Sequence, residues 1–316
     1  MERTELLSSI RDVLTSAGFY ASDLHSMRLT GFDIVARRDD SLLIIKVLTN
    51  VDSLSEGVAS ELKTLSSLLK GCSLLIGEKN GYGILEDDVA YFRFGIQAIT
   101  LGTLKNYLLE GMTVKVYAAP GGLYVHLDEE KLHRLRQEKN ISLGAFARYV
   151  SVSRRTVRMY EEGMNSRIEV ANRIEELLES SITIPINLLK NSFIGSKINS
   201  TYHSETENIK AFQREIFSLL QNVGYKIIPM DRCPFEALSK DREKILLTCV
   251  HKYNKKLLKK AQVVSSISKV TEKLAVVFTD KEINKRNVEG TPIIVKKELK
   301  KIKDPEEVFD LIIERI

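Results

Sequence analysis

The spacing of apolar residues changes along the 316-residue chain, and these changes divide it into regions. In the first region, apolar residues at helical spacing predict helices, and short apolar runs predict strands. We expect helices at about 5–17, 54–69 and 104–111, and strands at 32–37, 42–48, 72–77 and 97–101. This mixture predicts an α/β domain over residues 1–111.

The later regions follow from the same pattern. Residues 113–127 alternate apolar and polar positions around Pro120-Gly121-Gly122, which predicts a β-hairpin connector over residues 112–127. Residues 128–190 show helical periodicity, and the polar stretch 191–208 is typical of a linker. Residues 209–316 return to a mixed pattern, so we expect a second α/β domain there.

The two α/β regions share the order α-β-β-α-β-β-α, which suggests an internal duplication. A shift of 203 positions places Phe32 on Phe235 and the apolar run 42–47 on 245–250. Coincidence between two ordinary α/β domains is the alternative. The equal spacing of the first two strands favours duplication.

The central region carries the pattern of a helix-turn-helix. Asp128, Ser142 and Ser153 are suited to cap three consecutive helices, the first ending near Lys139. Small Ala147 suits the point where the second and third helices approach each other. The other inward-facing residues are expected to be Leu132, Leu135, Leu143, Phe146, Val150, Val157 and Tyr160. Gly163 stands where a helix needs a left-handed stop.

The outer face of the third helix is basic. Residues 139–160 hold five basic residues and no acid, and three of the five, Arg154, Arg155 and Arg158, lie opposite the inward face. Guanidinium groups can bind guanine edges and phosphates. We therefore expect double-stranded DNA as the partner. The candidate DNA-binding residues are Ser142, Leu143, Ser153, Arg154, Arg155, Thr156, Arg158 and Met159. The alternative is a protein-interaction scaffold whose helical bundle packs against another protein.

These residues resemble the phage-repressor (Cro-like) helix-turn-helix family. The matches are Ser142-Leu143, Ala147, Val152-Ser153, Thr156-Val157, Tyr160-Glu161 and Gly163. Three positions depart from the family pattern: Gly144 replaces a Glu or Gln, Ser151 a frequent glycine and Tyr160 a tryptophan. The resemblance implies a five-helix domain whose last helices are 166–178 and a short one at 185–189, with recognition helix 153–162 in the major groove.

The layout of the chain is also similar to a family of archaeal helix-turn-helix transcriptional regulators. There the motif directly follows a hairpin ending in Gly-Gly-aromatic-Tyr-Val, which here is Gly121-Gly122-Leu123-Tyr124-Val125. The resemblance implies a sequence-specific regulator. Readers of this class usually act as dimers on half-sites one helical turn apart, so we also expect a homodimer.

Residues 32–46 resemble the core of PD-(D/E)xK nucleases, in which two carboxylates hold Mg²⁺ and a lysine positions the attacking water. Asp33 and Lys46 match, but Ile44 stands where the second carboxylate belongs. The matching positions of the C-terminal region are Glu236, Leu247 and Cys249. The resemblance implies two inactive nuclease-like domains flanking the helix-turn-helix domain, and thus a multi-domain α/β protein that is not an enzyme.

Two alternatives to an inactive domain stay open. A metal-dependent, structure-selective nuclease would use Asp33 and Lys46 and would need Asp39, Asp40 or Glu5 as the missing ligand. An ordinary hairpin would leave Asp33 and Lys46 as surface charges.

Composition limits the remaining functions. Hydrophobic residues make up 43% and charged residues 28%, as in ordinary folded domains. No stretch approaches the roughly 20 apolar residues of a membrane span, and the acid-bearing N-terminus does not resemble a secretory signal. The three cysteines and five histidines lack metal-ligand spacing. We therefore expect a cytoplasmic protein without cofactor or metal, and the sequence leaves any effector open.

The charge is unevenly distributed. Residues 240–303 hold 18 basic against 7 acidic residues. This excess could meet a polyanion, or it could be a solvated surface.

Overall fold

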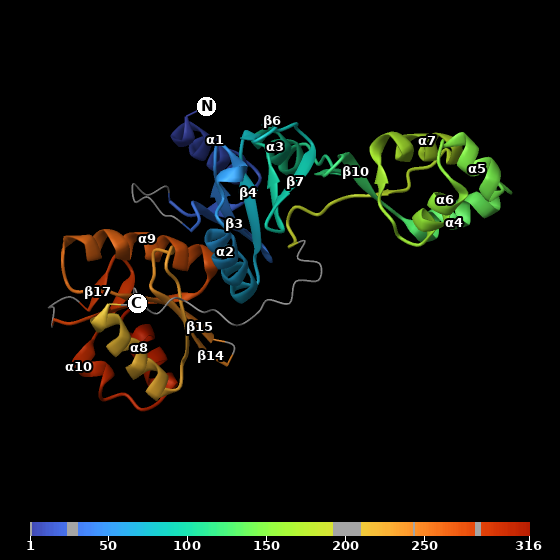
Figure 1. Ribbon diagram of the computed structural model, residues 1–316. Helices are drawn as coiled ribbons and strands as arrows, with labels where there is room; N and C mark the ends of the chain where they lie inside the picture. The colour runs from blue at the N-terminus through green and yellow to red at the C-terminus, as the bar shows by residue number, and fades with distance from the viewer. Residues whose placement is uncertain (1, 24–30, 192–209, 243, 282–285) are drawn as a thin grey trace. The chain divides into compact units, whose positions relative to one another are not determined.

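The computed structural model describes residues 2–23, 31–191, 210–242, 244–281 and 286–316. All of the expected linker except residue 191 lies outside them. The chain forms two compact units, and the N-terminal α/β region contributes to both (Figure 1). The first unit is Met1–Ala17, Val47–Leu54 and Leu74–Ser192, and the second is Gly18–Lys46, Ser55–Ser73 and Phe193–Ile316.

The first unit begins with α1 (Arg3–Ser16), which buries Leu6, Ile10 and Leu14 at helical spacing and packs against α3 (Leu101–Leu109). Its strands follow one another in the order β4 (Cys72–Ile76), β8 (Ile96–Ile99), β7 (Val89–Arg93), β9 (Val116–Ala119) and β10 (Gly122–Leu127). The β4–β8 and β7–β9 pairs are parallel, whereas β8–β7 and β9–β10 are antiparallel. A short 3-10 helix, η1 (Val51–Ser53), and a small hairpin, β5 (Lys79–Asn80) with β6 (Gly83–Ile84), complete this part.

The expected connector hairpin is formed by β9 and β10. Its turn depends on Gly121 and Gly122, whose φ values of 95° and 139° disfavour residues with a Cβ atom. Farther along, β10 pairs with β11 (Ser166–Arg167) and β12 (Thr183–Ile184), two strands of the helical region. One strand therefore belongs both to the α/β sheet and to the helical region.

The helical region contains α4 (Glu129–Glu138), α5 (Leu143–Tyr149), α6 (Arg154–Glu161) and α7 (Ile168–Leu178). Its core includes the fully buried Leu132, Phe146, Val150, Val157 and Ile174. Four consecutive helices agree with the sequence analysis.

The expected short fifth helix is wrong, since residues 185–189 of the described chain form no helix. The chain is extended here because Thr183 and Ile184 pair with β10, and Ile186 forms a bridge with Val114. Pro185, which has no backbone N–H to donate, suits this extended segment better than a helix interior.

The second unit holds the remaining elements. From the N-terminal region come β1 (Tyr20–Ala21), β2 (Ile34–Arg38), β3 (Ser41–Val47) and α2 (Glu56–Leu69), with β1–β2 and β2–β3 antiparallel. The C-terminal sheet has the order β13 (Lys226–Pro229), β14 (Ala237–Asp241), β15 (Lys244–Val250), β16 (Leu274–Thr279), β18 (Thr291–Val295) and β17 (Asn287–Val288). Its helices are α8 (Ala211–Val223), α9 (Lys255–Thr271), α10 (Lys296–Leu299) and α11 (Pro305–Glu314).

The strand registers support duplication of the α/β fold. The β2–β3 hairpin pairs Ile34 with Ile45, and the β14–β15 hairpin pairs Ala237 with Thr248, which is the same register 203 positions later. At the turns, Asp39 and Arg242, also 203 positions apart, both adopt left-handed φ values, 50° and 48°. Each copy also has a short first strand, β1 or β13, that the sequence analysis did not include.

Polar contacts join the two copies within the second unit. Arg37 of β2 covers the end of α9, donating from Nε to the Val270 carbonyl (2.9 Å) and from Nη2 to the Thr271 carbonyl (3.2 Å). On α2, the buried Glu61 carboxylate accepts a hydrogen bond from the Arg232 backbone N–H (2.9 Å). The Arg37 guanidinium lies at the negative end of the α9 dipole, and the Glu61 carboxylate is satisfied by hydrogen bonding.

Candidate nucleic-acid interface

Each of the first three helices of the helical region begins at a side-chain cap, as expected. Asp128 Oδ1 accepts from the Lys131 N–H (2.9 Å), Ser142 Oγ from the Ala145 N–H (3.2 Å), and Ser153 Oγ from the Thr156 N–H (3.0 Å). These bonds satisfy backbone donors that a helix start leaves open, and they fix where α4, α5 and α6 begin.

The turn between α5 and α6 depends on a left-handed residue. Ser151 has φ of 58° and is exposed, which explains why glycine is frequent at this position in the related pattern. Directly before it, Val150 is completely buried. Ala147, also buried, lies in α5, which packs closely against α6.

The outward face of α6 is the one expected to bind DNA. Val157 and Tyr160 are buried in the core of the helical region, as predicted. Exposed residues of the motif include Ser142, Ser153, Arg154, Arg155, Arg158 and Met159, whereas Leu143 and Thr156 are half-buried. The three arginines are therefore all accessible on one short helix.

Gly144 has a local use that the sequence did not suggest. A Cβ atom at this position would lie 2.9 Å from Nη2 of Arg154, so the guanidinium group rests against the start of α5. A larger residue would displace this guanidinium. The departure from the family pattern thus makes room for an arginine of the recognition helix.

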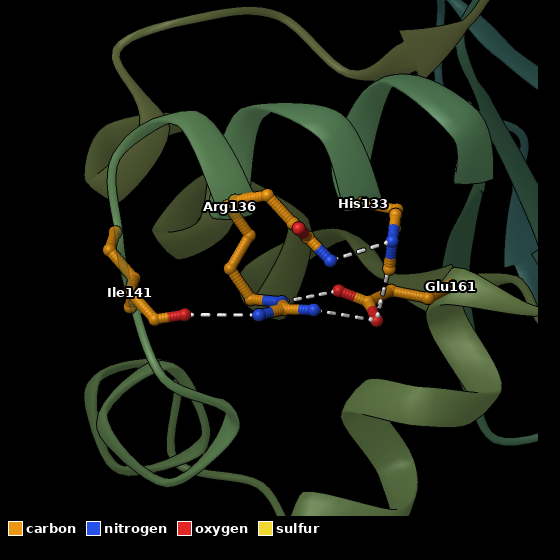
Figure 2. A network of polar contacts seen from close by, with 5 residues as sticks. His133, Arg136, Ile141 and Glu161 are labelled. Atoms are coloured by element: carbon orange, nitrogen blue, oxygen red, sulfur yellow. Dashed lines mark hydrogen bonds and ion pairs between the residues drawn. The ribbon is translucent and has the colours of Figure 1, made fainter.

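A buried ion-pair network holds α6 against α4 (Figure 2). Arg136 donates from Nε to Glu161 Oε1 (2.5 Å), from Nη2 to Glu161 Oε2 (3.1 Å) and from Nη1 to the Ile141 carbonyl (3.0 Å). His133 adds a contact of 3.1 Å from Nδ1 to Glu161 Oε2. The network fixes the end of the recognition helix relative to α4.

The charge of Glu161 depends on these partners. Burial alone would raise the pKa of Glu161, but hydrogen bonds from Arg136 and His133, together with their positive charges, lower it below its ordinary value. The pairing of Arg136 with Glu161 was not expected from the sequence. Its signal was available, because Arg136 follows the inward-facing Leu132 by four residues and so lies on the same face of α4.

Asp33 and Lys46, the two residues that match the nuclease pattern, form a buried ion pair. Lys46 Nζ lies 3.3 Å from Asp33 Oδ2, and both side chains are buried, with exposed fractions of 8% and 5%. The interpretation of Asp33 and Lys46 as surface charges is therefore wrong, because the β2–β3 hairpin is covered. Ile44, the residue in the position of the second carboxylate, is fully buried.

The C-terminal copy has a rearranged version of this pair. Glu236 accepts a hydrogen bond from the Val250 N–H (2.8 Å) and forms an ion pair with Lys260, which comes from α9 rather than from a strand. Leu247 and Cys249 are buried apolar neighbours. Among its described residues, neither copy offers the paired carboxylates that a divalent ion requires, so these residues do not fit the metal of active nucleases.

Nowhere among the described residues do three or more His, Cys, Asp or Glu side chains gather as a group that could hold a metal ion. No helix among them has the length and apolar character needed to cross a membrane.

Comparison with protein families agrees with this architecture. Residues 3–114 match a PD-(D/E)XK superfamily domain, and residues 132–184 match a helix-turn-helix domain. No solved structure matches the chain. Fold and site therefore define a helix-turn-helix protein that carries a nuclease-like domain.

Full-length relatives occur in several archaea and are provisionally named HTH-type transcriptional regulatory proteins. One from Methanosarcina barkeri is 39% identical over 100% of this chain and 98% of its own length. Relatives from Methanosarcina mazei (38%, with 100% and 98% coverage) and Archaeoglobus fulgidus (36%, with 98% and 97% coverage) are similar throughout. The chain belongs to this family of HTH-type transcriptional regulatory proteins.

Proposed function

We propose that this protein regulates transcription by binding specific sequences of duplex DNA in the cytoplasm, with α6 in the major groove. One observation carries the proposal: the outward face of α6 presents three accessible arginines, while residues 139–160 contain no acid. Such a face suits a duplex that carries one negative charge per roughly 1.7 Å of its axis. The names of the full-length relatives support the same function.

The residues of the motif would make different contacts with the DNA or with the helix itself. Arg154 and Arg155, at the first two positions of α6, would meet guanine edges or phosphates, and Arg158 would meet the backbone. Met159 is exposed four positions after Arg155, so it could contact a thymine methyl group. Ser153 and Thr156 keep the start of the helix in place through the cap.

Ser142 and Leu143 would approach the DNA backbone from the start of α5. The side chain of Arg154 lies against Gly144, the residue after Leu143, and so is close to this end of α5. Contacts of this kind fix the orientation of a reader on DNA and carry no sequence information of their own.

The DNA-binding proposal is tested with the full-length chain. Selection from a random duplex pool should return a preferred sequence, and Arg154→Ala/Arg155→Ala should weaken binding to it. The salt dependence of that binding should fall by about one unit of slope for each phosphate that the variant no longer binds. Arg134→Ala, which removes an exposed arginine of α4, is the matched control. Unchanged affinity and slope in the double variant would refute DNA docking through α6 and favour the scaffold alternative.

We also propose that the protein acts as a homodimer on two half-sites one helical turn apart. A selected sequence with two-fold symmetry supports this arrangement. Light scattering that shows a monomer at micromolar concentration, both free and on DNA, would contradict it.

We infer in addition that the nuclease-like fold is not catalytic in this chain. Ile44 replaces a metal-binding carboxylate, and the remaining Asp33 is already paired with Lys46. A cleavage assay on duplex and branched DNA with Mg²⁺ or Mn²⁺ should show no activity above background. Robust cleavage that Asp33→Ala abolishes would establish the nuclease alternative instead.

A further inference from the structure

The first unit contains a pocket of about 770 Å³ that the DNA-binding face does not use. It is lined by parts of η1, of the β5–β6 hairpin, of β7 and of the β9–β10 turn. Pockets for small molecules usually have volumes of about 300–1,000 Å³ and combine aromatic walls with a few polar groups. This pocket fits both parts of that description.

Its aromatic lining includes Tyr82, in the turn of the β5–β6 hairpin. Tyr82 is 99% exposed, yet the turn that carries it is fixed, because Asn80 Oδ1 accepts from the N–H groups of Tyr82 (2.9 Å) and Gly83 (3.1 Å). Half-buried Tyr91 and Phe92 lie in the same lining. Aromatic rings placed in this way suit stacking against a planar ligand.

The polar part of the pocket is a guanidinium group. Arg93 Nε lies 2.8 Å from Asp52 Oδ1, and the Arg93 side chain is 42% exposed. Within the described part of the chain this is the ionic contact that Arg93 makes, so both Nη groups remain for a ligand. A planar guanidinium binds carboxylate and phosphate groups through two parallel hydrogen bonds.

A path of side-chain contacts leads from the pocket to the helix-turn-helix domain. The ring of Phe92 meets Tyr117 of β9 edge-on at 6.1 Å, and Tyr117 stacks on His126 of β10 at 4.8 Å. His126 Nδ1 lies 3.0 Å from Asn165 Oδ1, just before β11 of the helical region. The pocket thus borders the hairpin that carries the DNA-binding domain.

We propose that this pocket is an effector site for a small planar aromatic molecule bearing a carboxylate or a phosphate. The ring lies against Tyr82 and Tyr91, the anionic group binds Arg93, and the bound molecule changes DNA affinity by acting on the β9–β10 hairpin. The regulatory part of this proposal rests on the proposed function, whereas binding in the pocket does not.

The test uses the full-length chain and two matched pairs of probes, AMP with adenosine and benzoate with benzyl alcohol, measured by isothermal titration calorimetry. At least one anionic probe should bind in the millimolar range or tighter, and its uncharged counterpart should bind about tenfold more weakly, the loss expected for a charge-assisted hydrogen bond. Whether AMP or benzoate binds separates a nucleotide from an aromatic acid. Arg93→Gln should weaken anionic binding about as much, Tyr82→Ser should weaken both members of a pair, and Arg134→Gln should change neither.

Binding to a selected duplex is then measured with and without the probe. A severalfold change in DNA affinity, absent in Arg93→Gln, supports the effector role. If no probe binds, or if Arg93→Gln binds as well as the natural protein, the pocket proposal is refuted while DNA binding without a probe still stands. If probes bind as expected but no duplex does, the proposed function fails and the ligand site remains.

Discussion

Replacement of Glu161 by glutamine tests whether the buried network holds the recognition helix in place. Glu161→Gln keeps the size of the side chain but leaves the Arg136 guanidinium without its counter-charge. In the folded protein these two side chains are only 9% and 10% exposed, so water can compensate little. Removal of one partner of a buried ion pair typically costs about 3–5 kcal/mol.

The same helix provides a matched control. Arg134 and Glu138 form an ion pair at 3.8 Å on the surface of α4, where their side chains are 63% and 60% exposed. An exposed pair at this spacing contributes about 0.3–0.5 kcal/mol, so Glu138→Gln should have almost no effect.

Amide hydrogen exchange followed by mass spectrometry is the suitable assay, because it reports local opening of one region within a chain of several domains. A loss of about 3–5 kcal/mol corresponds to a fall in protection of about 150- to 5,000-fold. The fall should appear in peptides from α4 to α7, and peptides from the C-terminal sheet should be unchanged. If Glu161→Gln lowers protection no more than Glu138→Gln, the network does not stabilise the domain and the reasoning is wrong.

Three further predictions concern other features. Acid should open the helical domain, because the pKa values of Glu161 and Glu175 are lowered in the fold. Their contribution to stability is complete above the ordinary glutamate pKa of about 4.3 and is lost as the pH falls through the lowered values. Hydrogen exchange measured from pH 6 to pH 3 should show this loss of protection, and Glu161→Gln should make the loss shallower. Ser151→Val should destabilise the α5–α6 turn by about 1–2 kcal/mol in thermal or urea unfolding, because a β-branched residue is disfavoured at left-handed φ, whereas equal loss in Ser151→Gly would contradict this explanation. Arg37→Ala should destabilise the second unit by about 1.5–3 kcal/mol in urea, since the last carbonyl groups of α9 lose a charged donor, and an unchanged midpoint would show that this cap contributes nothing.

The helix-turn-helix could be predicted closely because its signals are local. The caps Ser142 and Ser153 and the buried Val157 and Tyr160 follow from residues a few positions apart, which determine where a short helix begins and which face it buries. The duplicated β-hairpin was also predictable, because the first two strands have the same spacing in both α/β regions even though few of their residues are identical.

Features that depend on distant residues were not predictable in the same way. The burial of Asp33 and Lys46 is set by what covers their hairpin, and a local alternation of apolar and polar residues contains no such information. The fifth helix was expected from a family resemblance, whereas Thr183 and Ile184 instead complete an edge of β10. The Arg93 pocket brings together four separate segments, so no single stretch of sequence indicates it.

The shared strand β10 has a consequence for how such a regulator can change. A domain on a flexible linker can be exchanged without keeping an exact number of residues before it, because the length of the linker only sets how far the domain reaches. Here the DNA-reading domain is attached through the pairing of Tyr124 with Tyr117 on one side and with Arg167 on the other. Insertion of one residue in this strand would turn every following side chain to the opposite face. New operator preferences should therefore arise more readily by substitution on α6 than by recombination of whole domains.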